Sequence, residues 1–179
     1  MKRYILTGAP GAGKTAILHA LELGGQFVVE EAATDVIAVE QARGRPEPWR
    51  QPGFIDAIAD LQQRRQLRAA ASGCDVQIFD RSPVCTLALA RFLDFPVSGA
   101  LERELERIDR EAIYERRAFF IEDLGFMTNT EARRISLHDA VRFGRVHEET
   151  YRELGYELIR VEPGPVEARA AEILRAVQR

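Results

Sequence analysis

One segment near the N-terminus constrains the fold of this chain more than any other. It reads Gly8, Ala9, Pro10, Gly11, Ala12, Gly13, Lys14 and Thr15. The segment satisfies the pattern G-x-x-x-x-G-K-[S/T] at every fixed position. A short apolar run, residues 4–7, precedes it, and Ile17, Leu18 and Leu21 follow at helical spacing. We therefore expect a strand, a glycine-rich turn and a helix, in that order.

Each fixed position of this pattern has a chemical reason. The glycines let backbone N–H groups turn inward around phosphate oxygens, and a side chain at Gly13 would obstruct that approach. The helix that begins near Lys14 adds its positive N-terminal end. Lys14 is placed to reach the β- and γ-phosphates of a nucleotide, and the Thr15 hydroxyl can ligate Mg²⁺. The segment predicts a nucleotide site, with ATP and Mg²⁺ as the expected cofactors.

The composition makes this match more informative. Only two of the 25 basic residues are lysines, Lys2 and Lys14, and one of them occupies the lysine position of the pattern. The net charge of −3 gives no reason to expect nucleic acid as a partner. No apolar run approaches the roughly 18–20 residues that span a membrane. The two cysteines, Cys74 and Cys85, fit a reducing cytoplasm and are expected to fill small apolar spaces.

Short apolar runs alternate with amphipathic stretches along the whole sequence. Five runs have the character of strands: residues 4–7, 27–29, 76–79, 119–121 and 158–161. The intervening stretches repeat apolar residues at helical spacing, among them a stripe of Leu137, Val141, Gly144, Tyr151 and Leu154. This alternation predicts an α/β fold with a mainly parallel sheet, in which ligands bind beyond the carboxyl ends of the strands. The length supports one domain, residues 1–179.

Acidic residues follow the second expected strand. Glu31 is a candidate base, because a carboxylate at this strand end, facing the phosphate loop, could accept a proton from a substrate hydroxyl. The alternative is an acidic first turn that complements the dipole of a helix over residues 32–42. Both interpretations of Glu31 stay open. Glu30 and Asp35 are expected to be solvated.

Asp80 and Arg81 follow the third expected strand. An aspartate directly after a buried strand is placed to hold Mg²⁺ through water or to orient the substrate. Arg81 could clamp a substrate anion or the transferred phosphoryl group. A helix N-cap at Asp80 or Ser82, ahead of Pro83, is a structural alternative that does not exclude these roles.

With these motifs the sequence resembles a known family, the ATPase domain of the NAD-regulator and translocation-defect group of P-loop proteins. The matching pieces are residues 5–15, 28–33, 48–50, 79–81, 133–134 and 151–156. In the bacterial regulator this domain is a ribosylnicotinamide kinase, and the family is similar to nucleoside and nucleotide kinases. The resemblance implies a P-loop NTPase fold with helices on both faces of a five-stranded parallel sheet, ordered 2-3-1-4-5, and a kinase-like lid.

The lid would lie in residues 125–134. Arg133 and Arg134 could approach the phosphates on closure and neutralise the charge that develops in transfer, or they could form a solvated basic helix start. Trp49 could stack on a substrate ring or act as a hydrophobic anchor. His147 is expected to be a packed histidine rather than a catalyst. Arg64, Arg65 and Arg68 are expected on a solvated face.

These observations favour a cytoplasmic ATP- and Mg²⁺-dependent kinase that acts on a small hydroxylated acceptor, plausibly nucleoside-like. The expected catalytic groups are Lys14, Glu31, Asp80, Arg81, Arg133 and Arg134, with Thr15 and Asp80 as metal ligands. A GTPase should carry D-x-x-G and N-K-x-D, and the sequence has neither. The alternative is a regulatory module that binds ATP or GTP and signals to a protein partner. The acceptor and the oligomeric state stay open.

Overall fold

A computed structural model describes residues 1–122 and 137–178 of the chain. Its five strands form one parallel sheet in the order β2-β3-β1-β4-β5. The strands are β1 (Lys2–Thr7), β2 (Phe27–Val29), β3 (Val76–Asp80), β4 (Arg117–Ile121) and β5 (Glu157–Val161). All five expected strands are confirmed, and so is the strand order that the family resemblance implies.

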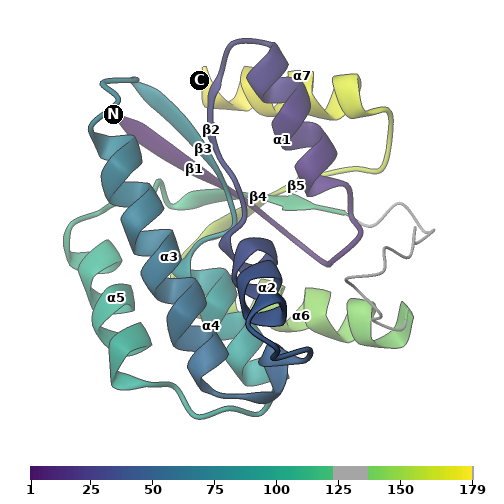
Figure 1. The fold of residues 1–179 in the computed structure, drawn as a ribbon. Helices are drawn as coiled ribbons and strands as arrows, with labels where there is room; N and C mark the ends of the chain where they lie inside the picture. Colours follow the sequence, from purple (N-terminus) through teal and green to yellow (C-terminus); the bar gives the residue numbers. More distant parts are fainter. Residues whose placement is uncertain (123–136, 179) are drawn as a thin grey trace.

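Helices cover both faces of the sheet, as Figure 1 shows. One face carries α1 (Lys14–Leu23) and α7 (Val166–Val177), which pack against each other. The opposite face carries the remaining helices. They are α2 (Ala32–Ala42), the short 3-10 helix η1 (Pro48–Arg50), α3 (Gly53–Ala70), α4 (Pro83–Phe92), α5 (Gly99–Arg110) and α6 (Leu137–Glu153).

Successive side chains of the central strand enter different cores, because neighbouring residues of a strand point to opposite faces. Tyr4 and Leu6 of β1 pack in the core that α1 and α7 close, whereas Ile5 packs in the core on the other face. Each fully buried Leu or Ile contributes about 1.5–3 kcal/mol relative to an exposed one. A sheet buried on both faces explains the nearly continuous apolar runs of the strands.

Helix α6 buries only part of the apolar stripe that the sequence predicts, since Gly144 and Tyr151 are buried but Val141 is not. Val141 is 45% exposed, whereas Phe143, His147 and Tyr151 are buried. These three residues lie on the face that packs against α4, which gives α6 its largest interface with another helix. The buried face therefore includes a histidine, a polar residue that hydropathy alone assigns to the surface.

The sheet brings the carboxyl ends of three strands together at one edge. The register pairs Leu6 of β1 with Asp80 of β3, and Val29 of β2 with Phe79. The segments that leave these strand ends, including the phosphate loop and Glu31, therefore start side by side. This edge is the expected ligand site of an open parallel sheet.

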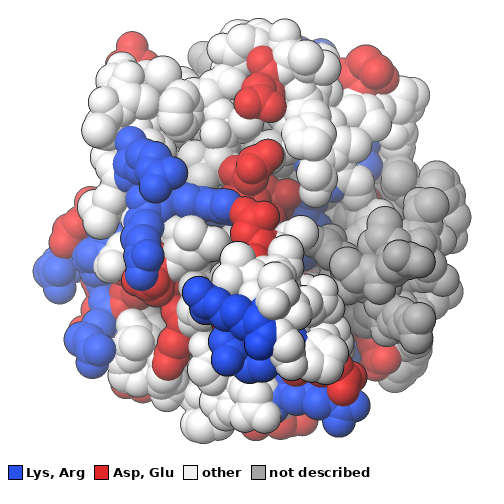
Figure 2. Space-filling model, viewed as in Figure 1, with Lys and Arg blue, Asp and Glu red and all other residues white. Residues whose placement is uncertain are grey.

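The surface mixes charges of both signs. On the face in Figure 2, basic side chains stand beside acidic ones rather than forming a continuous basic surface. Ion pairs such as Arg43–Glu40 and Arg64–Asp60 account for part of this mixing. Among the described residues, none of the helices has the length and apolarity needed to cross a membrane.

Candidate functional site

The phosphate loop joins β1 to α1 and depends on glycine backbone geometry. Gly8, Gly11 and Gly13 have φ angles of 127°, 86° and 87°, in the region that favours glycine. At Gly8 the positive φ disfavours a side chain, and there is no space for one either. A Cβ atom there would lie 2.4 Å from the carbonyl oxygen of Ile121 in β4. The first glycine of the pattern therefore serves a close approach between the loop and the neighbouring strand.

Lys14 is the first residue of α1 and is almost fully buried, at 5% exposure. Its Nζ donates hydrogen bonds to the carbonyl oxygens of Gly8 at 3.1 Å and Ala9 at 2.7 Å. The ammonium group is thus held across the mouth of the loop, where the terminal phosphates of a nucleotide would lie.

Arg169 of α7 binds the phosphate loop on the side that faces α7. Its Nη1 donates to the carbonyl oxygen of Ala12 at 3.0 Å, and its Nη2 donates to the carbonyl oxygen of Glu122 at 2.8 Å. The C=O and N–H of a trans peptide point in opposite directions. Arg169 therefore fixes the Ala12–Gly13 peptide with the Gly13 N–H on the side away from α7. Sequence reasoning missed this residue, because no local pattern connects positions 12 and 169.

Asp80 ends β3 beside the start of α1. The Thr15 hydroxyl donates to Asp80 Oδ2 at 3.4 Å, and Asp80 is 5% exposed. A hydroxyl and a carboxylate oxygen this close form the hard oxygen pair that Mg²⁺ accepts together with water and phosphate oxygens. The described residues contain no cluster of three or more His, Cys, Asp or Glu that could hold a metal by themselves. The two residues expected to serve Mg²⁺ are therefore brought together.

Arg81 follows β3 with a φ of 71° and is buried, at 8% exposure. Its Nε donates to Glu31 Oε1 at 2.6 Å in an ion pair. Burial is the largest single effect and would lower the pKa of Arg81, but the charges of Glu31 and Asp80 and the hydrogen bond to Glu31 act together against it, so the pKa is raised. The two residues that the sequence suggested for the base and the anion clamp are thus in direct contact.

Glu31 is the N-cap residue of α2, but its side chain makes no capping hydrogen bond to the helix backbone. Its second oxygen, Oε2, accepts a hydrogen bond from the Thr34 hydroxyl at 2.7 Å. The carboxylate is therefore oriented by side chains on both oxygens. Its place at the N-terminus of α2 also fits the helix-dipole alternative, so both interpretations of Glu31 stay open. Ser82 is the N-cap residue of α4, as the alternative expected, but its hydroxyl makes no capping hydrogen bond and lies 2.8 Å from Tyr151 Oη.

The turn after β2 is held by an arginine that was expected on a solvated face. Arg65 of α3 donates to the carbonyl oxygens of Glu30 and Glu31 and pairs with Asp35. Its side chain is 20% exposed, so the expectation for this residue is wrong. Arg64 and Arg68 are exposed as expected. The helical pattern of α3 predicts a surface position for Arg65. In the structure the β2–α2 turn packs over this position and covers it.

His147 of α6 is fully buried and contacts Arg81 from the side opposite Glu31. Arg81 Nη1 lies 2.9 Å from His147 Nε2, and His147 Nδ1 lies 2.9 Å from the carbonyl oxygen of Phe143. Burial lowers the pKa of His147 well below its usual value, and the charge of Arg81 lowers it further. The expectation of a packed histidine is confirmed. Its contact with Arg81 could not be predicted, because the two residues belong to different elements.

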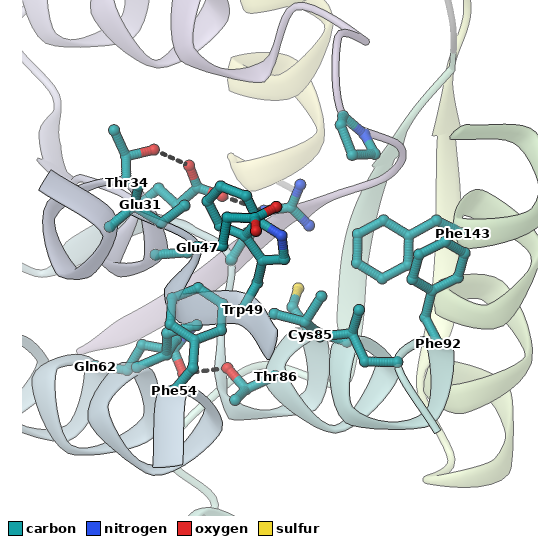
Figure 3. A pocket seen from close by; sticks show the side chains of 17 residues that line it. Glu31, Thr34, Glu47, Trp49, Phe54, Gln62, Cys85, Thr86, Phe92 and Phe143 are labelled. Atoms are coloured by element: carbon teal, nitrogen blue, oxygen red, sulfur yellow. Dashed lines mark hydrogen bonds and ion pairs between the residues drawn. The ribbon is translucent and has the colours of Figure 1, made fainter. Parts of the chain in front are cut away.

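A cavity of about 570 Å³ opens beside Glu31 and Arg81. Most of its walls are apolar, and Figure 3 shows Glu31 and Thr34 at one side of the view and Phe92 and Phe143 at the other. The residues come from the phosphate loop, α2, η1, α3, α4 and α6. Apart from Glu31 and Arg81, the main lining residues are Pro10, Thr34, Trp49, Phe54, Gln62, Cys85, Thr86, Phe92 and Phe143.

Trp49 lies where it could serve either as a hydrophobic anchor or as a stacking surface, the two roles that the sequence left open. It packs against the apolar cluster of Ala32, Val36, Phe54 and Ile58, and it also lines the cavity. Two polar residues also line the cavity, and the Thr86 hydroxyl donates to Gln62 Oε1 at 2.7 Å. Cys85 also lines this space, and its Sγ lies 3.1 Å from Tyr151 Oη. The cavity thus has aromatic walls with polar groups at defined points, as small-molecule sites do.

The remaining expected site residues, Arg133 and Arg134, lie outside the described residues. The same holds for the rest of the expected lid, residues 125–134.

Several solved structures share this fold. A NadR protein in complex with NAD and AMP-PNP matches with a TM-score of 0.68 and 17% identity, over 99% of this chain and 48% of that one. The present chain therefore spans about half the length of that NadR chain. Deoxyadenosine kinase from M. mycoides, with products dCMP and dCDP bound, matches with a TM-score of 0.62 and 14% identity over 99% of both chains.

Shikimate kinase from Acinetobacter baumannii, in complex with shikimate, matches with a TM-score of 0.58 and 15% identity, over 99% of this chain and 93% of that one. At these identities the likeness establishes the fold. No curated protein matches the sequence significantly. The model of an AAA domain family, however, matches residues 3–169, which is most of the chain, and the protein therefore belongs to this AAA-domain family.

Proposed function

We propose that this protein is an ATP- and Mg²⁺-dependent phosphotransferase whose acceptor is a small hydroxylated, nucleoside-like molecule. The observation that carries the proposal is the Glu31–Arg81 pair at one end of an aromatic-walled cavity, directly beside the phosphate loop. A nucleotide on the loop would direct its γ-phosphate toward this pair, and the cavity has room for an acceptor. The similar folds include kinases with dCMP, dCDP or shikimate bound, which supports a small-molecule acceptor.

In this proposal each group has a defined task. Lys14 and the loop N–H groups hold the β- and γ-phosphates, and Thr15 and Asp80 hold Mg²⁺. When bound, the metal neutralises the charge of the phosphate oxygens. Glu31 accepts the proton of the acceptor hydroxyl. Arg81, with Arg133 and Arg134 from the expected lid, stabilises the transferred phosphoryl group.

The cavity supports a ring-bearing acceptor. Trp49, Phe54, Phe92 and Phe143 supply flat apolar surfaces for a ring, and the acidic end is placed for a sugar hydroxyl. Both cysteines are free thiols, in keeping with a reducing cytoplasm as the place of action.

The test is a phosphorylation screen that uses purified protein, Mg-ATP and a panel of nucleosides that includes nicotinamide riboside. We expect mass spectrometry to detect one or more nucleoside monophosphates, formed at a rate that scales with enzyme concentration. ATP binding without any phosphorylated acceptor would contradict the kinase proposal. Slow acceptor-independent hydrolysis together with a captured protein partner would favour the regulatory module instead.

A further inference from the structure

Helix α6 contacts the phosphate loop, the cavity and Arg81. A Cβ atom built on Gly144 would lie 3.5 Å from Ala9 Cβ, so the helix passes next to the phosphate loop. Phe143 lines the cavity. One turn further along, His147 contacts Arg81. Burying a polar side chain at this point costs desolvation free energy that an apolar residue would avoid. The hydrogen bonds of His147 show what it does there in return.

The hydrogen bonds of His147 define which ring nitrogen carries the proton. The carbonyl oxygen of Phe143 can only accept, so His147 Nδ1 donates to it. A guanidinium has no acceptor, so Arg81 Nη1 donates to His147 Nε2. The imidazole is therefore neutral with its proton on Nδ1. An imidazolium would turn an N–H toward the N–H of Arg81.

Arg81 is held at two of its three nitrogens. Nε donates to Glu31 and Nη1 donates to His147, while Nη2 makes no hydrogen bond within the described residues. Arg81 also lines the cavity. Its left-handed backbone conformation costs about 1–2 kcal/mol for a residue with a side chain, so local preference does not set its geometry. Its backbone N–H donates to the carbonyl oxygen of Leu6 at 3.0 Å, and the two side-chain contacts hold the guanidinium.

We propose that His147 is a positioning residue, which fixes the Arg81 guanidinium so that its Nη2 edge stays available to the transferred phosphoryl group. The proposal rests on the function proposed above. A neutral acceptor suits this role, because it orients the guanidinium without cancelling its charge. A carboxylate at the same place would form a second ion pair and reduce the positive potential that Arg81 offers to phosphate.

Two substitutions separate positioning from packing. In His147→Gln the side-chain oxygen can take the place of Nε2 and accept from Arg81. In His147→Asn the shorter side chain reaches only the position of Nδ1, so a polar group stays near Phe143 but the acceptor for Arg81 is lost. His19→Asn, at an exposed histidine of α1, is the matched control. Thermal unfolding of each variant reports any loss of packing.

The first measurement is ¹⁵N NMR of the histidine rings at pH 7, with the His147 signals identified by their loss in His147→Gln. We expect a proton on Nδ1 and none on Nε2. We also expect the signal of the Arg81 Nη1–H group that faces His147 to persist in His147→Gln and to broaden or disappear in His147→Asn. A proton on Nε2, or an Arg81 signal unaffected by His147→Asn, would overturn the proposal.

The second measurement is steady-state kinetics with the nucleoside that the wild type phosphorylates fastest. His147→Asn should lower kcat about 10- to 100-fold, as a misplaced catalytic group does, with the KM for Mg-ATP unchanged. His147→Gln should recover most of this loss, and His19→Asn should behave as wild type. Equal kcat values for the Gln and Asn variants would contradict positioning.

The two measurements fail in distinguishable ways. If the wild type phosphorylates no nucleoside, the proposed function is wrong, but the NMR signals still decide whether His147 holds Arg81. If phosphorylation is observed and the NMR signals contradict the expected proton on Nδ1, only the role of His147 is wrong.

Discussion

The phosphate loop and the cavity beside Glu31, which we propose binds the acceptor, lie side by side, but they are built in opposite ways. The loop is eight consecutive residues, and it would bind phosphate mainly through backbone groups whose geometry three glycines set. The cavity draws its walls from α2, η1, α3, α4 and α6, and it depends on side chains. Backbone recognition leaves a sequence pattern, whereas a cavity assembled from distant helices leaves none. The two regions should therefore respond differently to substitution.

The largest effect is expected for Glu31→Gln on the cavity side. Loss of a general base should lower kcat by about 10²- to 10⁴-fold, with the dissociation constant for Mg-ATP unchanged. Steady-state kinetics and calorimetry measure the two quantities. Glu22→Gln, at an exposed carboxylate of α1, is the control and should retain wild-type rates. A wild-type kcat in Glu31→Gln would remove Glu31 from the mechanism.

Lys14→Ala tests the loop side. The loss of its ammonium group should weaken Mg-ATP binding and lower kcat/KM by about 10²- to 10³-fold. The chain supplies its own control in Lys2→Ala, since Lys2 is its other lysine and is exposed. Unchanged nucleotide affinity in Lys14→Ala, measured by calorimetry, would mean that the loop does not bind phosphate in this protein.

His147 predicts a pH dependence of stability. Because its pKa is lowered in the folded protein, the unfolded chain gains a proton on this group first as the pH falls below about 6.5. Arg81 and Lys14 oppose the imidazolium, whereas Glu31 favours it. The free energy of unfolding is therefore not affected by protonation of His147 above about pH 6.5, and it decreases as the pH falls below this value. The contribution lost by pH 5 is up to about 2 kcal/mol.

Urea unfolding of the wild type and of His147→Gln at pH 7 and pH 5 isolates this contribution. The carboxylates titrate in both proteins, so the difference between the two pH dependences belongs to position 147. Parallel curves for the two proteins would show that His147 is protonated in the folded state at pH 5.

Trp49→Ala should raise the KM for the acceptor by about tenfold, because one aromatic wall of the cavity is removed. The affinity for Mg-ATP should not change, since Trp49 lines only the acceptor side. Leu67→Ala, at an exposed apolar residue of α3, controls for general loss of apolar surface. A KM that stays the same while unfolding occurs at lower temperature would assign Trp49 to anchoring alone.

The smallest effect is expected for Arg169→Lys on the loop side. A lysine keeps the charge but cannot bridge two carbonyl oxygens with a rigid fork. Loss of about one hydrogen bond to Ala12 should weaken Mg-ATP binding by about three- to tenfold, with the KM for the acceptor unchanged. Arg175→Lys, at an exposed arginine of the same helix, is the control. Equal affinities in the two variants would show that the loop holds its shape without α7.

The sequence predicted the loop side well because its determinants are local. The positions of the glycines, Lys14 and Thr15 follow from one pattern, and Asp80 was placed by the end of a buried strand. The strand runs also predicted the five strands. The strand order came from the family resemblance, since periodicity does not define which strands are neighbours.

The cavity side could be predicted only in outline. Glu31 and Arg81 were identified one at a time, but their ion pair requires β2 and β3 to lie side by side. Arg65 and His147 received surface or packing roles, because their partners belong to other elements and appear only when the helices dock. Arg169 had no local signal at all.

The central claim is that the acceptor and the nucleotide meet at Glu31 and Arg81. The most direct test is a crystal structure with Mg-AMP-PNP and a nucleoside that the protein phosphorylates. We expect the nucleoside ring between Trp49 and Phe143, with one hydroxyl within hydrogen-bond distance of the Glu31 carboxylate and facing the γ-phosphate. A nucleoside bound outside the cavity, or with its reacting hydroxyl away from Glu31, would contradict the account.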